Sequence, residues 1–139
     1  MTKPDYMSKA INLALAQLGR TEPNPSVGCV IVKDGIIIGE GATCDGGSPH
    51  AEEMALDQAG QAAIGATAYV TLEPCGARSK GGLSCSEKLI LAGVSEVIYA
   101  ADDPSPFASH IGIERLKASG IKVTQNHVND QRIQWLYKA

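Results

Sequence analysis

The chain has 139 residues, 44% of them apolar and 19% charged, which is typical of one soluble globular domain. Its net charge of -3 gives no general attraction to phosphate backbones, so we expect no nucleic-acid partner. No apolar run opens the chain or approaches the length of a membrane span, which indicates a cytoplasmic protein without a signal peptide. We therefore expect its four cysteines to be reduced thiols.

Apolar periodicity and turn residues divide the chain into helices and strands. Helices are predicted over residues 5–18, 48–59, 84–92 and 109–119 and in the C-terminal tail, and strands over 27–33, 36–41, 66–72, 94–101 and 121–125. The pair Asp34-Gly35 favours a hairpin between the first two strands. The helix between the last two strands implies a parallel pairing by a right-handed crossover. The sequence therefore predicts a three-layer α/β/α domain around a mixed five-stranded sheet.

Two local patterns give sharper expectations. The isoleucine run 36–38 has no polar alternation, so we expect its strand to be covered on both faces. Ser48 is a favourable N-cap, with Pro49 at the first helical position, so we expect the second helix to begin there. This prediction places His50 at the N-terminus of the second helix.

His50, Cys75 and Cys85 are residue types that zinc prefers as ligands. Three ligands leave a fourth position for a water molecule, and Glu52 is placed to carry its proton. Cys75 leaves a predicted strand, and Cys85 lies in the first turn of a capped helix, where the dipole favours a thiolate. The spacing of the three ligands in the sequence does not by itself distinguish a catalytic zinc site from a structural one. The order His-x-Glu, strand, Pro-Cys and helix-start Cys matches the signature of zinc nucleobase deaminases, with a longer gap between the cysteines.

The remaining candidate groups lie in loops. Prolines on both sides hold Asn24, whose amide can donate and accept hydrogen bonds. Arg78 and Lys80 lie in the loop between the two zinc-ligand cysteines and are our candidates for binding a substrate phosphate. Cys29 is expected in the core, and Cys44 is expected to be a small loop residue rather than a ligand.

Several motifs together point to one family. They are Pro23–Gly28, His50–Glu52, Gly65–Cys75, Leu89–Val94 and Asp103-Pro104. By these motifs, nearly the whole chain resembles the deaminase domain of the bacterial riboflavin-biosynthesis deaminase–reductase, within the cytidine-deaminase-like superfamily. The resemblance implies three zinc ligands, at His50, Cys75 and Cys85. It further implies that Glu52 shuttles protons and that Asn24 contacts the base. The implied reaction replaces the 2-amino group of a diaminopyrimidinone ribosylamine phosphate by oxygen and releases ammonia.

The substrate side departs from the usual family pattern. The resemblance places Thr43, Ala51, Asp103 and Ser105 among the substrate contacts. Thr43 stands where the family has a substrate-side histidine, and Ser105 where it often has an asparagine. Ala77 replaces a further histidine in the loop after the first cysteine. These changes leave the metal ligands intact, so the resemblance implies deamination and leaves the exact substrate open.

Three other functions remain as alternatives. They are deamination of another cytosine-like nucleotide or base, deamination of tRNA adenosine, and a non-catalytic structural zinc site. The acidic charge argues against tRNA, and a closed structural site would leave Glu52 without a role. The family's usual C-terminal reductase is absent from residues 1–139, so we expect a deaminase domain alone. The superfamily commonly pairs subunits, so the resemblance is compatible with a homodimer, and the sequence itself leaves the oligomeric state open.

Overall fold

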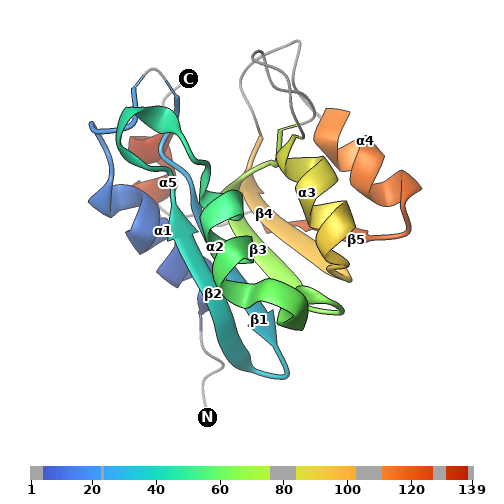
Figure 1. Cartoon of the computed structure of the whole chain (residues 1–139). Helices are drawn as coiled ribbons and strands as arrows, with labels where there is room; N and C mark the ends of the chain where they lie inside the picture. Colours follow the sequence, from blue (N-terminus) through green and yellow to red (C-terminus); the bar gives the residue numbers. More distant parts are fainter. Residues whose placement is uncertain (1–4, 23, 76–83, 103–110, 127–130, 138–139) are drawn as a thin grey trace.

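The computed structural model describes residues 5–22, 24–75, 84–102, 111–126 and 131–137. Five α-helices and five strands lie in this part of the chain (Figure 1). In chain order they are α1 (Tyr6–Ala16), β1 (Gly28–Lys33), β2 (Ile36–Ala42), α2 (Ala51–Ala59), β3 (Thr67–Leu72), α3 (Cys85–Ala92), β4 (Glu96–Ala101), α4 (Ile111–Ala118), β5 (Lys122–Gln125) and α5 (Gln131–Leu136). Short 3-10 turns at Asp45–Gly47 and Gly60–Ala63 flank α2.

The strands form one mixed sheet in the order β2-β1-β3-β4-β5. Strand β1 is antiparallel to both β2 and β3, whereas β3, β4 and β5 run parallel. Helices α3 and α4 make the two crossovers that parallel neighbours require. The prediction of a mixed five-stranded sheet is confirmed.

Helices cover both faces of this sheet (Figure 1). On one face α2, α3 and α4 bury small and branched side chains, among them Ala55, Leu89 and Leu116, against the strands. On the other face α1 and α5 pack through Ile11 and Leu136. This gives the expected three-layer arrangement and brings the N-termini of α2 and α3 to the same end of the sheet, as Figure 1 shows. None of the helices in the described ranges has the length and apolar character of a membrane span.

The expectation for the isoleucine run is wrong, because β2 is an edge strand. Ile36 is 64% exposed, and the next two isoleucines are only half-buried. The pairing with β1 also slips: Ile31 lies opposite Gly39 while Val32 lies opposite Ile37, so Ile38 has no partner of its own. Such a bulge breaks the alternation of faces, and the strand that is covered on both faces is β1.

The predicted start of the second helix is wrong by two residues. Ser48 is extended and lies outside α2, and His50 is the N-cap. The Glu53 carboxylate accepts a hydrogen bond from the backbone N–H of His50 at 3.1 Å, as the residue three positions after an N-cap does in a capping box. Other helix ends agree with the sequence: Ser84 caps α3 by accepting from the N–H of Glu87 at 3.2 Å, and Gly93 ends it in the left-handed region.

Candidate metal centre

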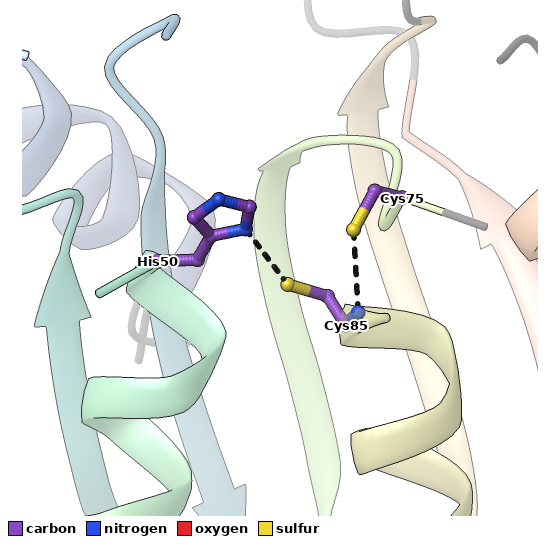
Figure 2. Close-up of side chains that lie close together, drawn as sticks. All are labelled: His50, Cys75 and Cys85. Carbon is purple, nitrogen blue, oxygen red and sulfur yellow. Dashed lines mark hydrogen bonds between the residues drawn. The ribbon is translucent and has the colours of Figure 1, made fainter. Parts of the chain in front are cut away.

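Three side chains meet where α2, β3 and α3 come together (Figure 2). His50 is the N-cap of α2, Cys75 follows β3 by three residues, and Cys85 is the first residue of α3. Their ligand atoms all lie within 4.8 Å of one another, and Nδ1 of His50 is 3.2 Å from Sγ of Cys85. The three predicted zinc-ligand side chains are therefore brought together by the fold.

The donor set and its dimensions fit zinc. Tetrahedral zinc with bonds of about 2.0–2.3 Å places its ligand atoms roughly 3.5–4 Å apart. The three ligand atoms lie within 4.8 Å of one another, and His50 Nδ1 is 3.2 Å from Cys85 Sγ, so shifts of about an ångström would bring them to this spacing. One imidazole and two sulfur ligands are a zinc combination, and three protein ligands leave one position for water or substrate. His50, Cys75 and Cys85 are the residues that would hold the ion.

The two ligand cysteines differ in their hydrogen bonds and therefore in the pKa of their thiols. The N–H of Cys85 donates to Sγ of Cys75 at 3.2 Å, and the N–H of Ser86 donates to the Cys75 carbonyl at 3.1 Å. A hydrogen bond from the Cys85 side chain, with further help from His50, lowers the pKa of Cys75 to about 4. That same contact and burial raise the pKa of Cys85. The contact between the two side chains thus favours a thiolate at Cys75 before Cys85, because the two sulfurs share one proton, whereas the sequence indicated a thiolate at Cys85.

Glu52 lies beside this cluster and is only 4% exposed. Burial, and then the negative charge of Cys75, raise the pKa of Glu52 to about 7, while a hydrogen bond with Cys85 acts in the opposite direction. A carboxyl group of this pKa can both accept and release a proton near neutral pH. His50 and Glu52 can serve the same site because the histidine is the N-cap and not part of the regular helix.

Two glycines allow the close packing behind the ligands. A Cβ on Gly41 of β2 would lie 2.5 Å from the carbonyl oxygen of Ala51, the residue after His50. A Cβ on Gly112 of α4 would overlap the carbonyl of Pro74, the residue before Cys75. Glycine at these positions lets backbone meet backbone and sets how closely each ligand approaches the centre.

Three of the predicted substrate residues lie in the described part of the chain, and four lie outside it. Asn24 donates from its side-chain nitrogen to the Gly47 carbonyl at 2.9 Å, which joins its loop to the turn before α2. Thr43 is buried and accepts from the N–H of Val27 at 2.9 Å, and Ala51 is fully buried. The other predicted contacts lie outside the described residues; these are Arg78, Lys80, Asp103 and Ser105.

The other cysteines agree with the sequence interpretation. All four are free thiols, Cys29 is fully buried in the core, and Cys44 is half-buried outside the metal cluster. Sequence reasoning missed Glu53 and Lys88, whose side chains form an ion pair of 2.6 Å between α2 and α3. The only sequence signal for Glu53 was its place three residues after His50, which becomes a capping-box spacing once histidine is accepted as an N-cap.

The mixed sheet brings one histidine and two cysteines to two helix starts and a strand end, beside a buried glutamate. This arrangement defines the class of zinc-binding deaminases. Comparison with known proteins agrees. Residues 1–101 match the family described as the cytidine and deoxycytidylate deaminase zinc-binding region. The chain belongs to the cytidine and deoxycytidylate deaminase family.

Within this family the chain is similar to riboflavin biosynthesis proteins. It is 52% identical over 121 residues to RibD of Escherichia coli, covering 86% of this chain and 32% of that protein. A structure of Acinetobacter baumannii RibD superposes with a TM-score of 0.89 at 46% identity, covering 96% of this chain and 37% of that one. The Thermotoga maritima diaminohydroxyphosphoribosylaminopyrimidine deaminase/5-amino-6-(5-phosphoribosylamino)uracil reductase gives a TM-score of 0.81 at 39% identity, with coverages of 94% and 38%. The chain thus spans about a third of the length of these relatives.

Proposed function

We propose that the chain is a zinc-dependent hydrolytic deaminase of a diaminopyrimidinone ribosylamine 5′-phosphate in riboflavin biosynthesis. One observation carries the proposal: three zinc-type ligand atoms within 4.8 Å of one another lie beside a buried glutamate. The similarity to RibD supports the substrate class, and the name of the Thermotoga relative supports the reaction.

The reaction needs a nucleophile and a group that transfers protons. When bound, zinc supplies a water of lowered pKa that can act as the nucleophile at neutral pH. Glu52 accepts one proton from the nucleophilic water and passes it to a ring nitrogen, then accepts the remaining hydroxyl proton and passes it to the departing amine. A carbon–oxygen bond forms, a carbon–nitrogen bond breaks, and ammonia leaves. Burial raises the pKa of Glu52, which favours a carboxyl group that can both take up and release a proton near neutral pH.

The substrate side is assigned by resemblance. We place Asn24, Thr43, Ala51, Asp103 and Ser105 at the base and sugar. Arg78 and Lys80 are placed at the phosphate because a dianion favours cationic, hydrogen-bonding partners. We expect a small-molecule nucleotide as substrate, no nucleic-acid partner, a cytoplasmic location and pairing of subunits. The four free thiols agree with a reducing compartment.

An ammonia-release assay tests the substrate. The panel contains the diaminopyrimidinone ribosylamine 5′-phosphate, its dephosphorylated form, dCMP and cytidine, each with zinc-loaded enzyme. We expect the first compound to give the highest kcat/KM. The second candidate is deamination of a cytosine nucleotide, which the description of the matching family favours. Preferential turnover of dCMP would replace the first assignment by the second.

Replacing Glu52 tests catalysis separately from metal binding. Glu52→Gln keeps the size of the side chain and removes its ability to accept a proton, so we expect turnover to fall by about 10²–10⁴-fold. Zinc content, measured by metal analysis, should be unchanged. Glu40→Gln is the matched control, because Glu40 is exposed on β2 and its variant should keep wild-type turnover. Full activity in Glu52→Gln would overturn the role of Glu52 in proton transfer, whereas a wild-type chain that binds zinc and turns over no compound of the panel would favour the structural zinc alternative.

A further inference from the structure

Glu53 joins the two helices that carry metal ligands. One of its carboxylate oxygens accepts from the backbone N–H of His50 at 3.1 Å. The other accepts from the ammonium group of Lys88 on α3 at 2.6 Å. A single side chain therefore contacts the backbone of one ligand residue and a neighbour of the other.

Lys88 is well placed for this connection. It follows Cys85 by three residues, and residues at this spacing lie on the same side of a helix. Glu53 follows His50 by the same interval at the start of α2. The Glu53–Lys88 ion pair thus lies about one helical turn from the metal cluster and connects α2 to α3. The separation of these two helix starts sets the distance between His50 and Cys85.

The surroundings make this ion pair stronger than an ordinary surface pair. The side chains of Lys88 and Glu53 are 28% and 19% exposed, whereas those of Arg20 and Asp45 in another ion pair are 60% and 63% exposed. Partial burial reduces screening by water and salt. The ion pair also lines a groove of about 470 Å³ between α2 and α3, so solvent reaches its outer side.

We propose that Glu53 and Lys88 are positioning residues that keep the His50 and Cys85 helix starts at metal-binding separation before the ion enters. This inference rests on zinc binding by His50, Cys75 and Cys85, as proposed above. Groups behind metal ligands orient them, and a ligand set that is already assembled loses less conformational freedom on binding. Loss of the Glu53–Lys88 ion pair should therefore weaken zinc binding even when the domain stays folded.

The test measures zinc affinity and needs no substrate. The full chain is stripped of metal and titrated with zinc in competition with a chromophoric chelator, at a temperature where circular dichroism shows each metal-free variant to be folded. Lys88→Met removes the charge and keeps the length of the side chain. Lys122→Met is the matched control, because Lys122 pairs with Glu96 at 3.9 Å where β4 and β5 begin, at the opposite end of the parallel strands from Cys75.

We expect Lys88→Met to raise the zinc Kd by about 10-fold, at the lower end of the 10–100-fold range for residues behind metal ligands. Glu53→Gln should act in the same direction, and the double variant should be no weaker than the worse single variant, because both changes remove one interaction. Lys88→Arg should restore most of the affinity. Lys122→Met should stay within about twofold of wild type, as expected for a contact away from the ligands.

The outcomes separate this inference from the proposed function. A wild-type chain that binds no zinc would overturn both. Wild-type binding together with an unchanged Kd in Lys88→Met would overturn the positioning role alone. A variant that unfolds more easily when metal-free, yet binds zinc like wild type, would show that the ion pair contributes only to stability. Because Lys88 is partly exposed, Lys88→Met remains informative if Glu53→Gln does not fold.

Discussion

His50 reaches the metal centre on a helix that lies directly against the β1–β2 hairpin, with Gly41 leaving room for the backbone of Ala51. Cys75 and Cys85 reach it on a strand end and a helix start, joined by main-chain N–H groups that point at Cys75. Both sides have a close backbone contact, of Gly41 with Ala51 and of Gly112 with Pro74, but only on the cysteine side does the backbone of one ligand donate to the side chain of another. The comparison teaches that one metal site can depend on two kinds of interaction, with different sensitivity to mutation.

The largest effect should follow removal of a ligand on the cysteine side. We expect Cys75→Ser to weaken zinc binding by about 300- to 8000-fold, since roughly a third of a binding free energy of about 10–16 kcal/mol is lost with one of three ligands. Chelator competition measures the change. Cys44→Ser is the matched control, because Cys44 is half-buried outside the cluster. Equal zinc affinity in the two variants would contradict the assigned ligand set.

An intermediate effect should follow from filling the close contacts on either side. Gly41→Ala forces the start of α2 away from β2, and Gly112→Ala forces α4 away from the Pro74 carbonyl. Overpacking of this kind lowers the free energy of unfolding by about 1–3 kcal/mol. We also expect weaker zinc binding in both variants, because each displaced backbone lies next to a ligand.

Gly39→Ala provides the control for this pair. A Cβ on Gly39 would meet the carbonyl of Ala55, in the middle of α2 and one turn beyond His50. Urea unfolding should show a similar loss of stability, while chelator competition should show a smaller change in zinc affinity than for Gly41→Ala. If all three variants lose the same zinc affinity, close packing at the ligand end has no special role.

The smallest effect should come from the cap of α3. Ser84 is fully buried and accepts from the N–H of Glu87, so Ser84→Ala should lower the free energy of unfolding by about 1 kcal/mol. Thermal unfolding should shift down by roughly 3–5 °C for a domain of this size. Ser119→Ala, whose hydroxyl donates to the Arg115 carbonyl at the exposed end of α4, should shift it less. A larger shift in Ser119→Ala would contradict the importance of the cap.

Much of the fold was readable from local signals. Turn glycines, capping residues and apolar periodicity located the helices and strands to within a few residues, because these signals act between near neighbours in the chain. The Ser84 cap is an example, since its partner Glu87 lies only three residues further along the chain. The motif order also indicated zinc, because few functions other than metal binding require His-x-Glu and two such cysteines in this arrangement.

The failures have a common cause. The isoleucine run 36–38 gave no sign that β2 forms the edge of the sheet, because the number of neighbours of a strand depends on pairing with distant segments. The start of α2 was misplaced because Ser48 and Pro49 are good local signals, whereas the turn before them is bonded to a distant loop, through Gly46 to Arg20 and through Gly47 to Asn24.

The sequence by itself determined the residue types of the metal centre, the alternation of helices and strands, and the three-layer class. Only the tertiary structure decided which sulfur the helix start serves, how Glu52 is buried, and that Glu53 and Lys88 connect the two ligand helices. The physical reason is that burial, helix-start N–H contacts and ion pairs between helices depend on distances through space. Residues 53 and 88 are 35 positions apart in the chain and in direct contact in the fold.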